Sequence, residues 1–207
     1  MKGKHLIITV GREYGSGGHD IAKLLAERMG LAFYDNELIT IAAKESGLGE
    51  DAFRRAEHIA TNSFEFAINS SAYPRQYGMN LNDRMYLVQS SVIRTIADRE
   101  DAVIVGRCSN AVLENYVESV DIFIGANPEF RVKEVMARDN LNEAEAKKFM
   151  QKMDKYRATY YNFYTSGAKW GDRRGYDLCI NRSDMTTEEV VDILEAYANG
   201  RRKALGI

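Results

Sequence analysis

A glycine-rich loop between two regular segments constrains the fold of this chain more than any other feature. The loop, Gly11–Gly18, holds four glycines in eight residues. A nearly continuous apolar run, His5–Val10, precedes it, and apolar side chains at helical spacing follow it as far as Gly30. A glycine directly after the last periodic residue commonly ends a helix. We therefore predict a strand, a loop and a helix in succession, which is the opening of a nucleotide-binding α/β fold.

Further along the chain, four short apolar runs are separated by helical patterns. Strands that are apolar on both faces belong to parallel sheets with helices on each side. We predict one five-stranded parallel sheet with the first strand in the middle and the glycine loop at its C-terminal edge. Two helices are expected over 128–164, the second beginning at a capping box at Asn142, and a last helix should begin at Thr186. The four runs are Ala32–Tyr34, Ala102–Gly106, Val120–Gly125 and Asp177–Ile180.

Composition excludes several classes of protein. The 207 residues are 45% apolar and 28% charged, which is typical of one globular domain, and no repeat divides them. A net charge of −2 provides no basic field for nucleic acid, and no apolar run approaches the roughly 18 residues that span a membrane. The apolar run near the start is too short for a secretion signal. The two cysteines and three histidines have no metal-ligand spacing, so we expect a cytoplasmic single domain, 1–207, without a protein-held metal site.

The glycine loop favours phosphate binding, because glycines let main-chain N–H groups approach a polyphosphate and the following helix adds positive charge. Its letters fit neither common fingerprint. In a GxGxxG pattern the third glycine would be Asp20, and in a Walker A loop, GxxxxGK[ST], the lysine position falls on Gly18 and the hydroxyl positions on His19 and Asp20. A tight turn without a ligand is the alternative.

Taken together, several stretches resemble the cytidylate kinase-like family of P-loop nucleoside monophosphate kinases. The resemblance extends over nearly the whole chain, which makes it more specific than any one motif. It implies a three-layer P-loop kinase fold that uses ATP and Mg²⁺ and acts on small nucleotides. The stretches that carry it are residues 11–22, 25–30, 33–39, 103–107, 176–181 and 185–191.

The resemblance also divides the chain into functional parts. It implies a core of about 1–35, 101–130 and 175–207, a helical insert of about 36–100 that binds the nucleoside monophosphate, and a lid of about 131–174 that closes over ATP. Residues 131–174 include 11 basic and six acidic side chains, a local excess of +5 that suits an anionic ligand. Most of the lysines among them are more simply explained as a solvated helix face.

Site residues follow from these positions. The resemblance assigns the nucleotide to the loop residues and catalysis to lid residues, because arginine forks bind phosphate oxygens bidentately. Arg131 and Arg138 are seven apart, hence on one helix face, while Asp154 and Arg157 are three apart and can pair or share a ligand. Asp35 and Arg107, each after a strand, would contact the acceptor; their alternatives are a helix cap and a surface ion pair. The predicted set is Gly11, Gly15, Ser16, Gly17, Gly18, His19 and Asp20 for ATP; Arg12, Arg131, Asp154 and Arg157 for catalysis; and Asp35, Arg107 and Arg138 for substrate.

The chain departs from the family pattern at the P-loop lysine, which contacts the β- and γ-phosphates in ordinary P-loop kinases. Gly18 cannot replace it. Arg12 has the required length and permanent charge, and His19 is a weaker candidate. Cys108 stands where many of the family have aspartate. We therefore predict a kinase that transfers the γ-phosphoryl group of ATP to a nucleoside monophosphate. A degenerate nucleotide-binding regulator and a small-molecule kinase are the rivals, and a homo-oligomer remains compatible with the sequence.

Overall fold

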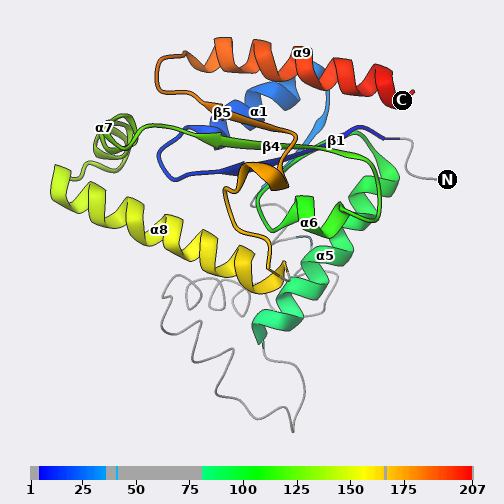
Figure 1. Ribbon diagram of the computed structural model, residues 1–207, viewed down its shortest axis with the longest axis horizontal. Helices are drawn as coiled ribbons and strands as arrows, with labels where there is room; N and C mark the ends of the chain where they lie inside the picture. The colour runs from blue at the N-terminus through cyan, green and yellow to red at the C-terminus, as the bar shows by residue number, and fades with distance from the viewer. Residues whose placement is uncertain (1–4, 36–40, 42–80, 166, 207) are drawn as a thin grey trace, which may run out of the picture.

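The computed structural model of the protein describes residues 5–35, 41, 81–165 and 167–206. Their five strands form one parallel sheet in the order β2-β3-β1-β4-β5, with helices on both faces (Figure 1). The three-layer α/β fold and the central position of the first strand are as predicted. The strands are β1 Ile7–Arg12, β2 Ala32–Tyr34, β3 Ala102–Val105, β4 Ser119–Gly125 and β5 Leu178–Asn181.

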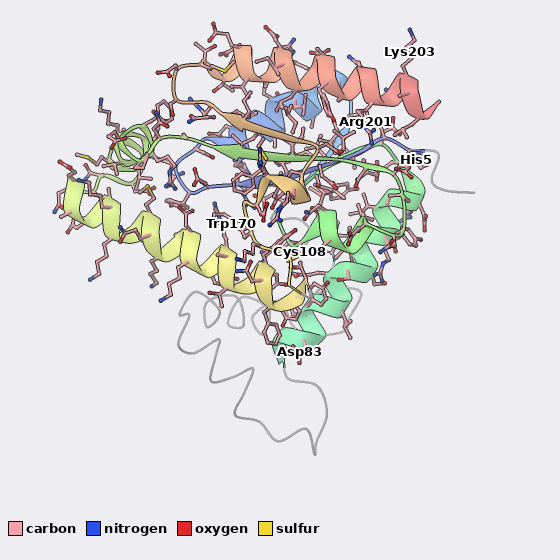
Figure 2. The ribbon with its side chains drawn as sticks, viewed as in Figure 1. His5, Asp83, Cys108, Trp170, Arg201 and Lys203 are labelled. Carbon is pink, nitrogen blue, oxygen red and sulfur yellow. The ribbon has the colours of Figure 1, made fainter. Side chains whose placement is uncertain are left out.

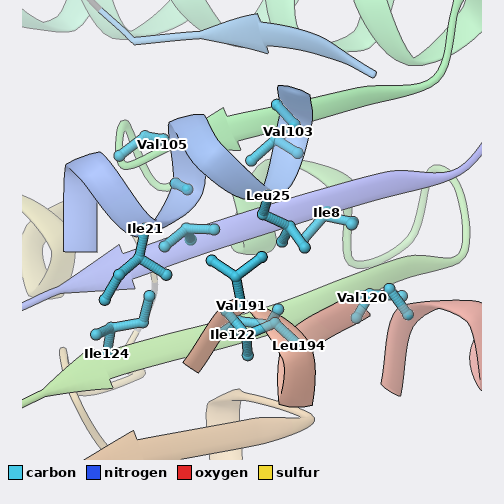
Figure 3. Packing of buried hydrophobic residues seen from close by; sticks show 14 of the residues in the cluster. Ile8, Ile21, Leu25, Val103, Val105, Val120, Ile122, Ile124, Val191 and Leu194 are labelled. Carbon is cyan, nitrogen blue, oxygen red and sulfur yellow. The ribbon is translucent and has the colours of Figure 1, made fainter. Parts of the chain in front are cut away.

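Alternation along the buried strands explains why both faces of the sheet are covered. Successive side chains point to opposite faces. Ile7 packs against α5 (Leu81–Arg99) and α6 (Ser109–Leu113), whereas Ile8 packs against α1 (Gly18–Met29) and α9 (Thr187–Leu205). The register places Ile8 beside Val103 of β3 and Val120 of β4, so apolar rows continue across the sheet. Figure 3 shows the α1–α9 side of this core.

Local signals set the helix ends as expected. α1 ends at Gly30, whose left-handed backbone donates to the carbonyls of the last turn. α8 (Glu143–Tyr164) begins with a complete capping box at Asn142, and α9 begins with another at Thr186. α7 (Pro128–Asp139) and α8 are the two helices predicted over 128–164, and a short 3₁₀ turn, Arg173–Gly175, leads into β5. In Figure 1, α8 runs from α7 toward α5, below the sheet.

Strand bounds differ from the sequence expectation by one or two residues, and the extension of β1 affects the site. β1 continues two residues past Val10, so Arg12 is the last residue of the strand and its position is tied to the sheet. Residues 81–99 of the expected insert form α5, which packs on β3 and α6. The rest of that insert, apart from residue 41, lies outside the described residues, so the division into core, insert and lid stays a prediction.

Candidate active site

A cavity of about 180 Å³ opens at the C-terminal ends of β1 and β3. Four of the predicted site side chains line it, and a wall of aromatic residues faces them. Figure 2 places Cys108 and Trp170, both lining residues, between the sheet and α8. The charged lining side chains are Arg12, Asp35, Arg107 and Arg157; the aromatic ones are Tyr156, Tyr160, Tyr161, Trp170 and Tyr176.

Arg12 crosses the base of the glycine loop. A Cβ atom added to Gly18 would lie 2.6 Å from the Cβ of Arg12, and one added to Gly106 would overlap the Arg12 guanidinium. Glycine at both positions leaves room for the arginine side chain. Burial and the nearby guanidinium of Arg157 lower the pKa of Arg12 to about 9, so it stays a cation at neutral pH. The space next to residue 18, where a P-loop lysine would start, is filled by Arg12.

Asp35 anchors this cation at the end of β2. Its carboxylate is buried, with Oδ1 3.7 Å from Nη2 of Arg12 and Oδ2 3.1 Å from Nε2 of His19. The other ring nitrogen of His19 lies 3.1 Å from Oδ1 of Asp20. His19 thus bridges two carboxylates at the start of α1. The arrangement joins Arg12, His19 and Asp35 into one polar group at the edge of the cavity.

A left-handed turn after β3 brings Arg107 into the lining of the cavity. Gly106, Arg107 and Cys108 have φ values of 78°, 56° and 56°. Two non-glycine residues in this region are unusual, and such backbone strain is found most often at functional sites. Burial raises the pKa of the Cys108 thiol to about 12, so the side chain after Arg107 is a neutral thiol rather than a carboxylate.

Tyr14, a loop residue absent from the predicted set, connects the loop to α7 and α8. The guanidinium carbons of Arg138 and Arg157 lie 4.7 Å and 5.4 Å from its ring centroid. Its hydroxyl donates to Asp139 (3.2 Å) and its N–H donates to Asp154 (2.7 Å). The sequence signal was an aromatic residue inside a phosphate-type loop. One ring therefore holds two of the predicted arginines beside the loop.

The charged side chains of α7 and α8 do not form the pair that sequence spacing allows. Asp154 forms an ion pair with Arg131 of α7, and Arg157 donates instead to the main-chain carbonyl of Arg12 at 3.0 Å. Arg131 is buried and also donates to the carbonyl of Tyr14 (3.2 Å). It does not line the cavity, whereas Arg157 does. The structure thus brings Arg157 to Arg12 and leaves Arg131 as a tie between α7, α8 and the loop.

The glycines of the loop have different neighbours. A Cβ at Gly15 would lie 2.8 Å from the carbonyl oxygen of Arg131, so this glycine allows close packing on α7. The hydroxyl of Ser16 donates to the carbonyl of Glu13 and accepts from the N–H of Gly18. Gly17, the N-cap of α1, has a left-handed backbone and no capping side chain. The first N–H groups of a helix have no intrahelical partner, and those of α1 begin here.

The aromatic wall follows the inner face of α8. Tyr156, Tyr160 and Tyr161 line the cavity, whereas Tyr164 stacks on Tyr86 at 4.1 Å. Aromatic residues at helical spacing more often pack between helices than line a cavity. Both situations occur on α8, because Tyr164 packs against α5 while the other three tyrosines line the same cavity as Arg12.

Replacing the Tyr14 ring should cost far more than removing its hydroxyl. We expect Tyr14→Leu to lower the free energy of unfolding by about 2–3 kcal/mol, because two cation–π contacts and an edge contact with Phe149 are lost. Tyr14→Phe should cost less than about 1 kcal/mol, since it loses one hydrogen bond. Urea titrations followed by circular dichroism would measure both. Equal losses would show that the hydrogen bond to Asp139, rather than the ring, holds α7 and α8 against the loop.

The described part of the chain offers neither a protein-held metal site nor a membrane-spanning helix. Residues 5–35, 81–165 and 167–206 contain no cluster of three or more histidine, cysteine, aspartate or glutamate side chains able to hold a metal ion. Among the same residues, no helix combines the length and apolar character needed to cross a bilayer.

A glycine loop between the central strand of a parallel sheet and a helix, with arginines around it, defines the P-loop kinase class of fold. A shikimate kinase from Acinetobacter baumannii in complex with shikimate is similar over 95% of each chain, with 13% identity and a TM-score of 0.52. A gluconokinase from Sinorhizobium meliloti 1021 is similar over 99% of this chain and 97% of its own, with 12% identity and a TM-score of 0.53.

The chain belongs to the cytidylate kinase-like family, whose model matches residues 7–184. A cytidylate kinase from Sulfurisphaera tokodaii is 20% identical over 196 residues, which are 94% of this chain and 96% of that one. The crystal structure of an uncharacterized protein from Eubacterium ventriosum ATCC 27560 has 30% identity and a TM-score of 0.71, over 94% of this chain and 99% of its own.

Proposed function

We propose that this protein is an ATP-dependent nucleoside monophosphate kinase that phosphorylates CMP or dCMP. The observation that carries the proposal is the position of Arg12. A permanent cation occupies the space beside Gly18 from which a P-loop lysine would extend. In this proposal an arginine that enters from the strand takes the place of the lysine and supplies the positive charge that phosphoryl transfer requires.

In this proposal the acceptor phosphate lies in the cavity between Arg12, Arg107 and Arg157. One of its oxygens attacks the γ-phosphorus of ATP while the bond from that phosphorus to the β–γ bridging oxygen breaks, and ADP leaves. Charge builds on the bridging and equatorial oxygens, so arginines fixed in place before the reaction stabilise the transition state. The hydrogen bond from Arg157 to the carbonyl of Arg12 keeps the two cations together in the absence of phosphate.

The cavity also suits the rest of an acceptor nucleotide. Tyrosine and tryptophan side chains present flat surfaces on which a pyrimidine can stack, and Asp35 can accept hydrogen bonds from a hydroxyl or an exocyclic amine. The neutral thiol of Cys108 adds no charge to this region. CMP and dCMP combine the phosphate, sugar and base that these groups would bind.

The arginines around the cavity suit the negative charge of ATP, and they do not suit a Mg²⁺ ion held directly by the protein. The hydroxyl that coordinates Mg²⁺ in ordinary P-loops is replaced by His19, and the hydroxyl of Ser16 is already hydrogen-bonded within the loop. Mg²⁺ would neutralise charge while held mainly by ATP phosphates and water. Gly17, Gly18 and His19, at the start of α1, would face the phosphates. Such an enzyme would work in the cytoplasm, where its nucleotides are.

A coupled assay of ADP release against CMP, dCMP, UMP, AMP and free nucleosides would test the proposal. We expect turnover with CMP or dCMP that exceeds the ATP hydrolysis rate without acceptor by at least about 100-fold. Turnover with nucleosides but not with monophosphates would favour the small-molecule kinase. ATP binding without turnover on any acceptor would favour the degenerate regulator.

A further inference from the structure

The turn after β5 holds an arginine that the phosphate-loop argument does not use. Arg182 follows Asn181, and its N–H donates to the carbonyl of Gly125 (3.0 Å) while its carbonyl accepts from Met185 (3.0 Å). Side chains around it fasten the same turn to the end of β4: Asn181 donates to Asn127 at 2.8 Å, and Ser183 accepts from the N–H of Asn127 at 2.6 Å. The main chain of Arg182 is therefore fixed relative to the sheet.

The Arg182 side chain reaches the glycine loop from this turn. A Cβ at Gly17 would overlap its Nη1 and would lie 3.2 Å from its Cζ, so the guanidinium lies directly against the loop. Phe130, in the first turn of α7, covers one face of the guanidinium, with Cζ 4.8 Å from the ring centroid. The in-plane N–H groups, which form hydrogen bonds, are left for another partner.

Arg182 has no counter-charge within the described chain. In residues 5–35, 81–165 and 167–206 it forms no ion pair, and its Nε is buried without a hydrogen-bond acceptor. Other arginines near the loop are compensated differently: Arg12 by Asp35 and Arg131 by Asp154. A buried donor without an acceptor is unfavourable, and a cation beside the positive end of a helix adds repulsion. An anion bound on the loop would remove both costs.

We propose that Arg182 binds the phosphate chain of the donor nucleotide at the Gly17 side of the loop. The inference rests on the proposed function, because ATP supplies the anion. It adds a second arginine to the donor site, because Arg182 lies against Gly17 whereas Arg12 lies against Gly18. A purely packing role against Phe130 would not require a guanidinium that forms no ion pair among the described residues to lie against Gly17.

Isothermal titration calorimetry with ATP, tripolyphosphate and adenosine would separate the possible partners. Arg182→Ala should weaken ATP and tripolyphosphate binding by the same factor, at least about tenfold, which is the loss expected for a charged hydrogen bond. Adenosine binding should not change. Arg182→Gln keeps most of the stem against Phe130 and should show the same loss, which protects the test if the alanine variant folds poorly. Arg94→Ala is the matched control, since it removes the cation–π contact that Arg94, an exposed residue of α5, makes with the ring of Tyr116.

Each outcome decides the proposal. Weaker adenosine binding with unchanged tripolyphosphate binding would assign Arg182 to the base or ribose and overturn the inference. Unchanged affinity for all three ligands would leave it a packing residue and overturn the inference alone. Wild-type protein that binds neither ATP nor tripolyphosphate would instead refute the proposed function, and the inference with it.

Discussion

Arg12→Ala should lower kcat and kcat/KM together by about two to three orders of magnitude. The reason is that Arg12 would act on charge that develops at the β–γ bridge, so its loss removes binding in the transition state more than in the ground state. Loss of one such preorganised donor costs roughly 3–4 kcal/mol. Steady-state measurements of ADP release with CMP as acceptor would give both constants.

Two further variants, one in the same cavity and one on the solvent-exposed side of α8, show whether the loss of activity is specific to the site. Arg157→Ala should show a similar defect, because Arg157 lines the same cavity and donates to the Arg12 carbonyl. Lys148→Ala should change neither constant by more than about twofold, since Lys148 is exposed on the solvent side of α8. An Arg12→Ala enzyme with unchanged kcat would show that Arg12 does not take part in phosphoryl transfer.

Gly18→Lys introduces a lysine at the P-loop lysine position, and we expect it to lower the stability of the protein. Its Cβ would lie 2.6 Å from the Cβ of Arg12 and 3.3 Å from the Cβ of Ile124, and neither atom can rotate away. Overpacking of this kind costs about 1–3 kcal/mol, which for a chain of this length lowers Tm by about 2–12 °C. Differential scanning calorimetry would measure the change.

Gly18→Ala is the matched control, because the clash is with Cβ itself. The backbone of Gly18 is not left-handed, and alanine is otherwise better in a helix than glycine by about 1 kcal/mol. A lower Tm for Gly18→Ala therefore reports contact with Arg12. A Gly18→Lys protein with wild-type Tm and faster turnover would mean that the loop lacked a cation and that Arg12 does not fill the place.

Sequence patterns predict the strands and helices of this molecule well, because these elements depend on residues that are close together in the chain. The periodicity of His5–Val10 and of the helix up to Gly30 reflects burial on one strand and one helix. The capping boxes at Asn142 and Thr186 need only residues three apart. The positions of Asp35 and Arg107 follow from the rule that parallel strands end on the ligand side of the sheet.

The pairing of charged side chains depends on contacts between distant segments, and sequence spacing misses it. Asp154 and Arg157 are neighbours on α8, yet Asp154 pairs with Arg131, 23 positions away. Tyr14 meets Arg138 and Arg157 only when the loop packs on α7 and α8. Arg182 lies against Gly17 although the two residues are far apart in the sequence, and no sequence pattern predicts that contact.

The replacement of the P-loop lysine by Arg12 is tested by the turnover of four proteins: wild type, Arg12→Gly, Gly18→Lys and the double variant. Glycine rather than alanine is needed at position 12, because a side chain at 18 would meet the Cβ of Arg12 at 2.6 Å and alanine keeps that atom. Arg12→Gly therefore frees the space that a lysine at 18 needs, and the two changes should couple strongly. We expect the double variant to exceed Arg12→Gly by at least about tenfold in kcat/KM with CMP, while Gly18→Lys alone falls below wild type. A double variant no faster than Arg12→Gly, or a Gly18→Lys enzyme faster than wild type, would contradict this role of Arg12.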